Sequence, residues 1–295
     1  MTVSKEAPVL VIGASGRVGR TVIAELLRLG RPVRALVRRP PPTPFLAGVE
    51  VVVADLTDPD SLTPALAGVE EVFLVWAAGP ATVSAVVARL ARSVSRVVFL
   101  SSPHQTPHPF FRQPNPMAAL HADIERELAT SGLPSVILRP GMFAANTVAW
   151  WAPQIRAGDV VRWPYGAVET APIDERDIAA VAVRALSEAS LAGGDYVLTG
   201  PEALSHARQV EVVGEVLGRR LAFHELSPDD FRRETAATWP PSAVEMLLAA
   251  WGAAVGHPAY VTTTVADLTG APARSFRDWV AAHADSFRNA GGEGG

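Results

Sequence analysis

Apolar and amphipathic segments alternate along the first two thirds of the chain. Residues 8–13 form a short apolar run of mostly branched side chains that ends in glycine, the pattern of a strand buried on both faces of a parallel sheet. From residue 17 to residue 29, apolar side chains recur at helical spacing, and Gly30 and Pro32 then end the pattern. The chain therefore begins with a predicted β-strand that leads directly into an α-helix.

The same alternation continues and predicts an α/β fold. Strand-like runs recur near 33–37, 49–54, 72–76, 97–101 and 135–138, with helical stretches at about 60–66, 80–92 and 117–131. Strands that alternate with helices pair in parallel, and the helices cover both faces of the sheet. We therefore expect a doubly wound parallel sheet.

The pattern changes after Gly141. A stretch rich in tryptophan and proline is followed by a predicted helix at 174–187 and by a last strand at 195–198 that rejoins the sheet. From Pro201 onward the pattern is mostly helical. Ser205 is expected to cap a helix, and further helices are predicted near 227–235, 242–250 and 275–287.

Composition excludes several classes of chemistry. Among 295 residues, 48% are hydrophobic and 19% are charged, the balance of a chain that buries a large core. There is no cysteine, which excludes a thiol nucleophile, a disulfide framework and a zinc site built on thiolates. Lys5 is the single lysine, so a phosphate loop with a Gly-Lys-Ser/Thr motif and a kinase ATP lysine are also excluded.

Charge and hydropathy argue against large anionic partners. The net charge is −4 and the isoelectric point is about 6.0, so there is no global basic field to hold nucleic acid or anionic lipid. No stretch of about 18 uninterrupted apolar residues occurs, and residues 1–7 lack the pattern of a signal peptide. We expect a cytoplasmic protein that binds neither nucleic acid nor membrane, and the choice between monomer and homo-oligomer stays open.

A glycine-rich loop joins the first strand to the first helix. It reads Gly13-Ala-Ser-Gly-Arg-Val-Gly19, so its amides and the N-terminus of the helix can face a pyrophosphate. Gly13 allows the tight turn, Gly16 lets the backbone approach the phosphates, and Gly19 allows close packing of helix against strand. We expect Ser15 and Val18 to contact the same dinucleotide.

The end of the second strand indicates which dinucleotide binds. Where an NAD-selective fold places an acidic residue against the ribose 2′-hydroxyl, this chain has Arg38 and Arg39, whose guanidinium groups suit a 2′-phosphate. Arg17, inside the glycine loop, can approach from the other side. We therefore predict NADP(H), against the alternative that Arg38 and Arg39 only form a solvated edge.

Two further positions are assigned to the cofactor. Asp55 follows the third strand, where it either lies near the adenine or caps the helix that begins near Pro59. Trp76 ends the fourth strand, at the carboxyl edge of the sheet on which we expect the dinucleotide to lie.

Several stretches resemble the NmrA-like branch of the atypical short-chain dehydrogenases. They are the GxxGxxG loop at 13–19, the segment 34–39, the segment 131–141 followed by Phe143 and Asn146, and the segments 172–179 and 196–202. The branch includes quinone reductases, isoflavone-reductase-like enzymes, polyketide-tailoring ketoreductases and regulators that bind the nucleotide without turnover. The resemblance therefore implies a fold and a cofactor but not one activity.

The resemblance also implies a division of the chain. Residues 7–200 would form a Rossmann-like domain that binds NADP(H), with an insert at 141–170 that lines the substrate site. Residues 201–295 would form a smaller, mostly helical C-terminal substrate region, and the active site would lie in the cleft between the two.

Typical short-chain dehydrogenases protonate the substrate with the tyrosine of a Tyr-x-x-x-Lys motif, which this chain lacks. None of its three tyrosines is followed four residues later by lysine. When Glu125 is aligned with the family's glutamate on the same helix, Met117 takes the tyrosine position and His121 takes the lysine position. An apolar side chain therefore replaces the usual acid.

Three sources of a proton remain open. His121 could be the general acid, because the ordinary pKa of histidine is about 6.5, or it could lie on the helix surface or position the ribose. Ser101 or Ser102, after the fifth strand, could hydrogen-bond to the substrate carbonyl. Water or a phenol on the substrate could also supply the proton, with hydride delivery and geometry doing most of the catalysis.

Aromatic and apolar side chains predict a flat substrate pocket. The proline-rich loop at 103–116, with Phe110 and Phe111, is expected to cover the nicotinamide as a flap. Asn146 is expected to orient the substrate or to cap the next helix. Prolines prevent a regular helix through His104 and His108, so we predict no metal site. The remaining expected substrate contacts are Met117, Met142, Phe143, Trp150 and Trp163.

Together these features predict an NADPH-dependent reductase. Its substrate would be the ketone or quinone carbonyl of an aromatic, polycyclic small molecule, as in the tailoring of polyketide antibiotics. A regulator of the NmrA type that senses NADP(H) without chemistry is the alternative, and the missing Tyr-Lys pair favours it. The tryptophan-rich insert and the flap favour the enzyme, and a binding protein for an apolar ligand comes third.

Overall fold

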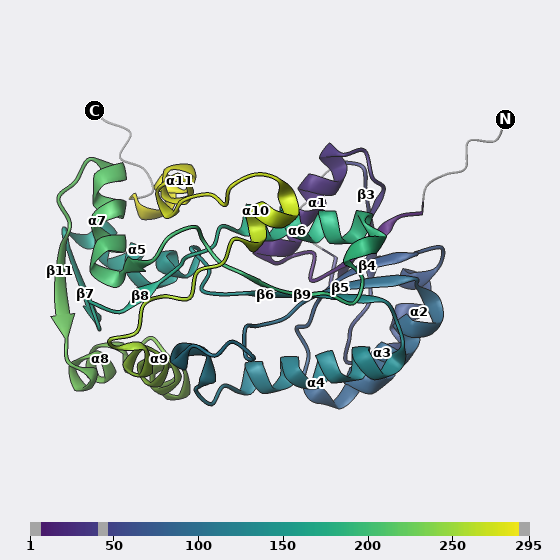
Figure 1. Cartoon of the computed structure of the whole chain (residues 1–295), viewed down its shortest axis with the longest axis horizontal. Helices are drawn as coiled ribbons and strands as arrows, with labels where there is room; N and C mark the ends of the chain where they lie inside the picture. Colours follow the sequence, from purple (N-terminus) through teal and green to yellow (C-terminus); the bar gives the residue numbers. More distant parts are fainter. Residues whose placement is uncertain (1–6, 41–46, 289–295) are drawn as a thin grey trace.

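The computed structural model describes residues 7–40 and 47–288, and Figure 1 shows the whole chain. Lys5 lies outside the described residues. None of the helices in the described ranges combines the length and the apolar character needed to cross a bilayer.

A parallel sheet of seven strands forms the centre of the molecule, which confirms the predicted fold class. Its order is β3-β2-β1-β4-β5-β6-β9, and Val9 of β1 pairs with Val33 of β2 on one side and with Glu71 of β4 on the other. The strands are β1 Val9–Ile12, β2 Val33–Val37, β3 Val49–Val53, β4 Glu71–Val75, β5 Arg96–Leu100, β6 Ser135–Pro140 and β9 Asp195–Leu198.

Helices cover both faces of this sheet (Figure 1). On one face, α1 and α6 pack against each other and bury side chains such as Val22 and Ile178 together with Val9 of β1. On the other face, α2, α3 and α4 bury Leu62, Val86 and Ile124 against the opposite side of the same strands. The bounds are α1 Arg17–Arg28, α2 Leu62–Leu66, α3 Val83–Ser93, α4 Pro116–Ser131 and α6 Glu175–Ser187.

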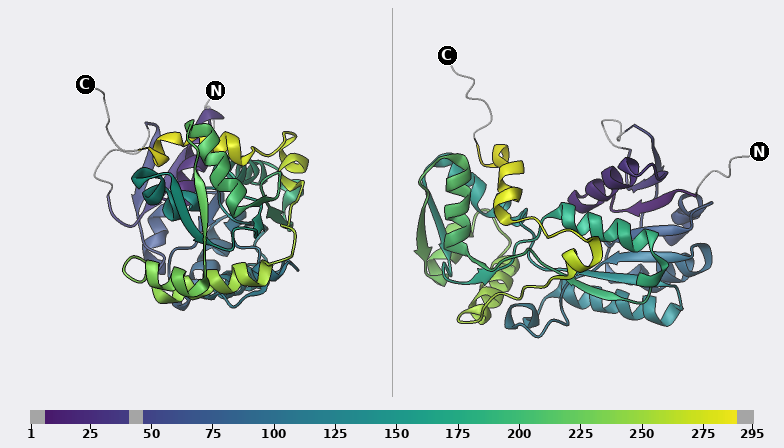
Figure 2. Two further views of the ribbon diagram at one scale, coloured as in Figure 1. Left: turned by 90° about the vertical axis from the view of Figure 1, so that its left-hand side faces the viewer. Right: turned by 45° about the horizontal axis from the view of Figure 1, so that its top comes forward.

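The C-terminal region lies beyond the carboxyl ends of the strands (Figure 2). Here α5 and β7 join the later elements around a third apolar core, so segments before and after residue 200 fold together. Two small sheets pair β7 with β11 and β8 with β10. The elements are α5 Asn146–Ala157, β7 Val160–Pro164, β8 Glu169–Thr170, β10 Leu204–Ser205, α7 His206–Leu217, β11 Ala222–Leu226, α8 Pro228–Thr235, α9 Pro241–Ala254 and α11 Phe276–Ala282.

Several local predictions can be compared with this structure. Ser205 caps α7 by accepting a hydrogen bond from the Arg208 amide at 3.1 Å, as expected. Asp55 does not cap the next helical turn, because Asp58 has that role. Asn146 does not cap α5, because the capping position is Ala145. The helix expected after Asn146 is α5. The sequence pattern missed the four short strands of the C-terminal region and α10 (Thr264–Thr269), which packs against α6 and β9.

The glycine loop joins β1 to α1 at very close range. Gly13 has a φ of +85°, and a side chain there would lie 2.6 Å from the Cβ of Val75. A Cβ at Gly19 would lie 2.3 Å from the carbonyl oxygen of Gly13, so only glycine lets the first turn of the helix rest on the end of the strand. The amide of Gly16 donates to the carbonyl oxygen of Gly13 at 3.0 Å, and Ser15, Gly16 and Arg17 are exposed at the N-terminus of α1.

We predict that Gly19→Ala lowers the free energy of unfolding by more than about 2 kcal/mol, because the backbone of the loop has to move to admit the methyl group. Gly79→Ala is the matched control: its φ is −72° and no atom lies within 4 Å of the added carbon. Urea denaturation measures both variants, and equal stability of the two would contradict this account of the loop.

Candidate functional site

A cavity of about 360 Å³ opens at the carboxyl ends of the first four strands of the chain. Gly13, Ser15 and Gly16 form its floor, and Arg38 and Asp55 line it from the ends of β2 and β3. These five residues are among those expected to bind the cofactor. The other lining residues are Ile12, Leu36, Val37, Leu56, Val75, Ala77 and Ala78.

Arg38 is free to bind an anion. Among the arginines, all of which fall in the described ranges, the side chains that make no hydrogen bond or ion pair are Arg38, Arg39, Arg112 and Arg220. Asp55 accepts a hydrogen bond from the Thr57 amide at 2.9 Å, which lowers the pKa of its carboxyl, and the charge of Arg38 adds to this effect. The cavity therefore offers the N-terminus of α1 and the glycine loop for a pyrophosphate and an unpaired guanidinium for a 2′-phosphate.

The remaining expected cofactor residues do not line this cavity. Trp76 is buried in the core, where its indole donates a hydrogen bond to the carbonyl oxygen of Ala78 at 2.8 Å. Val18 is buried beneath the loop, and Arg39 is exposed at the outer edge. Trp76 therefore supports the cavity wall through its neighbours, because a strand buried on both faces turns this side chain into the core.

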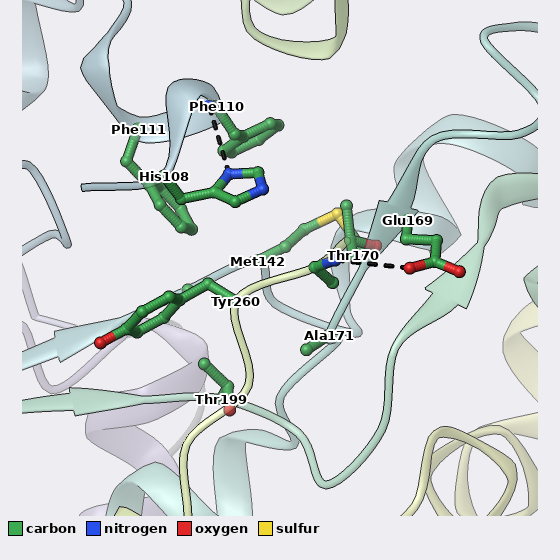
Figure 3. Close-up of a pocket in the computed structure, with 11 residues that line it drawn as sticks. His108, Phe110, Phe111, Met142, Glu169, Thr170, Ala171, Thr199 and Tyr260 are labelled. Carbon is green, nitrogen blue, oxygen red and sulfur yellow. Dashed lines mark hydrogen bonds between the residues drawn. The ribbon is translucent and has the colours of Figure 1, made fainter. Parts of the chain in front are cut away.

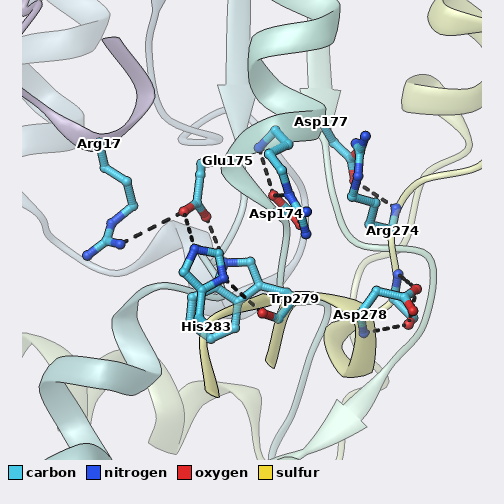
Figure 4. Close-up of polar contacts among 10 residues, drawn as sticks. Arg17, Asp174, Glu175, Asp177, Arg274, Asp278, Trp279 and His283 are labelled. Atoms are coloured by element: carbon cyan, nitrogen blue, oxygen red, sulfur yellow. Dashed lines mark hydrogen bonds and ion pairs between the residues drawn. The ribbon is translucent and has the colours of Figure 1, made fainter. Parts of the chain in front are cut away.

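Arg17 instead faces α6, 3.8 Å from the carboxylate of Glu175 (Figure 4). Glu175 accepts a hydrogen bond from the Trp279 indole at 2.8 Å, and its other oxygen lies 3.3 Å from Nε2 of His283. Nearby, Asp177 accepts a hydrogen bond from the Arg274 amide at 2.8 Å and pairs with its guanidinium. The N-terminus of α6 thereby ties the segment around α11 to the nucleotide-binding half.

A second cavity, of about 100 Å³, lies at the end of β5, against the N-terminus of α4. Ser102 and His104 line it on the strand side, and Met246 and Leu247 of α9 close it on the other. A smaller space of about 20 Å³ lies beside it, next to Met142 and Tyr260 (Figure 3). Both spaces are also lined by Phe110 and Phe111, whose rings lie 4.9 Å apart and separate them.

A buried ion pair underlies the second cavity. Glu125 of α4 accepts hydrogen bonds from Nε and Nη2 of Arg139 at 3.1 and 2.6 Å, and both side chains are less than one tenth exposed. Arg139 also pairs with Asp195. Ser101, one of the expected catalytic residues, donates its hydroxyl proton to Glu125 and is buried, so the hydroxyl is engaged in the protein.

His121 lies one turn before Glu125, with its ring edge-on to Phe99 at 5.6 Å. Burial lowers the pKa of His121 to about 4, so the ring is neutral near pH 7. A neutral imidazole is a weak acid, and these surroundings do not suit the role of general acid that the sequence suggested.

Unpartnered polar atoms gather in the same place. The Ser102 hydroxyl, Nε2 of His104, Oγ1 of Thr106 and Nδ1 of His121 are buried without a hydrogen-bond partner among the described residues. Buried polar atoms are rarely left unpaired in native proteins. Of these four residues, Ser102 and His104 line the cavity, and Nε2 of His104 lies toward Glu125. Ser102 is the one expected catalytic residue that both lines the cavity and has an uncommitted hydroxyl.

The expected substrate contacts are only partly brought together. Met142 lines the smaller space, whereas Met117 is 53% exposed on the surface of α4. Phe143 bridges to Ile173, and Asn146 begins α5; neither lines a cavity described above.

Trp150 and Trp163 belong to an aromatic core, not to a cavity wall. Their rings stack at 5.7 Å, and Trp163 packs against Phe231 and Trp251 at 4.8 and 5.4 Å. The structure therefore corrects the expectation that they form flat walls for a substrate, because the region after residue 200 covers them.

Sequence reasoning also missed some residues of the site. The sequence motifs give His104 no role other than that of a possible metal ligand. Among the described residues, no three or more His, Asp or Glu side chains are placed together to bind a metal ion. Met246 and Tyr260 come from segments that carry no motif. They can be assigned to the site only from the structure, in which the C-terminal part of the chain packs against the carboxyl edge of the sheet.

Comparison with known proteins agrees with this geometry. A family model described as NAD(P)H-binding matches residues 13–189. A (4-alkanoyl-5-oxo-2,5-dihydrofuran-3-yl)methyl phosphate reductase of Streptomyces griseus subsp. griseus is 40% identical over 286 residues, 95% of this chain and 99% of the relative. An NAD(P)H azoreductase of Xenophilus azovorans is 29% identical and covers 95% of this chain and 99% of its own.

A solved structure extends the comparison to the cofactor. The NADPH-dependent quinone oxidoreductase of Escherichia coli, crystallised with NADPH, superimposes with a TM-score of 0.80 at 27% identity, over 94% of this chain and 99% of that one. The family match, the 40% identity and the open glycine-loop cavity together show that the chain belongs to the NAD(P)H-binding, NmrA-like family of atypical short-chain dehydrogenases and is an NAD(P)H-dependent oxidoreductase.

Proposed function

We propose that this chain is an NADPH-dependent reductase of conjugated carbonyl compounds, such as quinones and unsaturated lactones or ketones. The observation that carries the proposal is Ser102, which lines the cavity at the end of β5 and whose hydroxyl is buried without a hydrogen-bond partner among the described residues. It supplies one hydrogen-bond donor for an acceptor oxygen, at a place where the chain offers no Tyr-Lys pair.

The missing pair favours conjugated acceptors for a chemical reason. Bound NADPH supplies a hydride. An isolated ketone that accepts hydride becomes a strongly basic alkoxide, which needs a strong proton donor. A quinone or an unsaturated carbonyl spreads the new charge over a phenolate or enolate, which is less basic. A single preorganised donor such as Ser102 is enough to stabilise that oxygen until water protonates it.

The lining of the site supports a flat, apolar acceptor. Phe110, Phe111 and Met142 provide apolar surface on one side, and Met246 and Leu247 provide it on the other. The two small spaces fit an acceptor with one or two rings more readily than a larger polycyclic one. The sequence predicts a polycyclic acceptor mainly because Trp150 and Trp163 would form flat pocket walls. Both side chains pack in the third apolar core instead, so that argument no longer holds.

Names of relatives point in the same direction. The relatives are named for reducing a quinone, an azo compound and an alkanoyl furanone phosphate. The quinone and the furanone share a carbonyl group conjugated to a carbon–carbon double bond. We take that shared chemistry, and not any one of these compounds, as the substrate class of this chain.

Selectivity for NADPH follows from the unpaired guanidinium of Arg38. We predict that Arg38→Ala raises the dissociation constant of NADPH at least about tenfold and that of NADH less than about twofold, because only NADPH loses a charge-assisted contact to its 2′-phosphate. Arg220→Ala, at another unpaired arginine remote from the cavity, is the matched control. Fluorescence titration measures both cofactors, and an equal loss for NADPH and NADH would overturn the assignment.

Turnover tests the proposed activity itself. Purified protein should oxidise NADPH with naphthoquinones and unsaturated lactones, and isolated aryl ketones should be poor acceptors. Ser102→Ala should lower kcat/KM for these acceptors at least about tenfold, the effect of losing one donor to a developing oxyanion. The dissociation constant of NADPH should stay the same. Tight NADPH binding without turnover of any acceptor would favour the nucleotide-sensing regulator instead.

A further inference from the structure

The loop after β5 is held by a histidine that has no place in the sequence motifs. Nδ1 of His104 lies 3.0 Å from the carbonyl oxygen of Ser102, and Nε2 lies 3.6 Å from a carboxylate oxygen of Glu125. The side chain is 13% exposed. Both ring nitrogens therefore face protein groups, and the ring lines the cavity with its side.

The contact with the Ser102 carbonyl shows that Nδ1 of the ring carries a hydrogen. A carbonyl oxygen only accepts, so Nδ1 of His104 carries the hydrogen and donates it to Ser102. Nε2 makes no hydrogen bond in the described structure and lies toward Glu125, which Arg139 already holds. A proton on Nε2 would point at the carboxylate and not at the cavity, so the ring is badly placed to protonate a substrate.

The backbone around Ser102 is held on both sides. On one side, the amide of Ser101 donates to the carbonyl oxygen of Leu138 at 2.7 Å, and the Ser101 hydroxyl donates to Glu125. On the other side, the Ser102 carbonyl accepts the Nδ1 hydrogen of His104. The direction of the Ser102 hydroxyl depends on this peptide plane, because the side chain has only one rotatable carbon–carbon bond.

We propose that His104 is a positioning residue of the reduction: its Nδ1 hydrogen fixes the Ser102 peptide and so aims the Ser102 hydroxyl at the acceptor oxygen. This rests on the proposed function, in which Ser102 donates to that oxygen. A misplacement of about 1 Å at such a donor is enough to lower the rate strongly.

Two substitutions separate the two ring nitrogens. In His104→Asn, the side-chain amide nitrogen takes roughly the place of Nδ1 and can still donate to Ser102. In His104→Gln, it takes roughly the place of Nε2 and reaches Glu125 instead. We expect the Asn variant to keep at least about half of kcat/KM for a naphthoquinone, and the Gln variant to lose about tenfold or more. His224→Asn, at an exposed histidine of β11, is the control and should leave the rate unchanged.

A double-mutant cycle and a binding measurement complete the test. Because His104 acts through Ser102, Ser102→Ala combined with His104→Gln should be no worse than Ser102→Ala alone. Quenching of tryptophan fluorescence by the naphthoquinone, in protein loaded with NADP⁺, should show weaker binding in the Gln variant than in the Asn variant, with NADP⁺ affinity unchanged in both.

The outcomes distinguish this inference from the proposed function. If the Asn and Gln variants lose kcat/KM equally, and if both abolish a pH dependence that the wild-type rate shows, His104 is a proton donor and the positioning role is overturned. Equal activity of all variants, or additive effects in the cycle, would also overturn it. Wild-type protein that oxidises no NADPH would refute the proposed function. The binding measurement would still test His104, because weaker naphthoquinone binding in the Gln variant than in the Asn variant would support the positioning role, and equal binding in both would overturn it.

Discussion

The buried ion pair between Glu125 and Arg139 holds together the elements around the second cavity, where we propose that the acceptor binds. It joins α4 to β6, and the same carboxylate accepts the Ser101 hydroxyl and faces His104. Removing one partner of such a pair costs about 3–5 kcal/mol, because the other charge is left buried without compensation. The loop after β5 is therefore fixed to the sheet by charge as well as by backbone pairing. These contacts set the orientation of the Ser102 backbone, which is next to Ser101.

The cofactor side depends on a different constraint, the contact between Gly13 and Gly19 that brings α1 onto the end of β1. The two sides meet because parallel strands all end at one edge of the sheet, where ligands bind in open α/β folds. The C-terminal region closes this edge, and the contacts of Glu175 and Asp177 with the segment around α11 hold it in place (Figure 4). The site thus combines a phosphate cradle, the uncommitted hydroxyl of Ser102 and apolar walls.

The sequence predicts the parts of this arrangement that are local. Seven strands, the glycine loop and the cap at Ser205 follow from periodicity and from residues close in sequence. The pairing of β7 with β11 does not, because each strand is short and the two are distant in the chain. Trp163 could not be assigned to core or pocket from its type alone. The environment of His104 depends on Glu125, whose partner Arg139 lies on another element.

The central claim is that hydride enters a conjugated system whose oxygen is held by Ser102, and the position of the hydride in the product tests it most directly. The measurement uses an unsaturated ketone and NADPH deuterated at the transferring position, with the product analysed by NMR. The account predicts deuterium on the carbon β to the carbonyl group, with the carbonyl retained. Deuterium on the carbonyl carbon itself, giving an allylic alcohol, would contradict it.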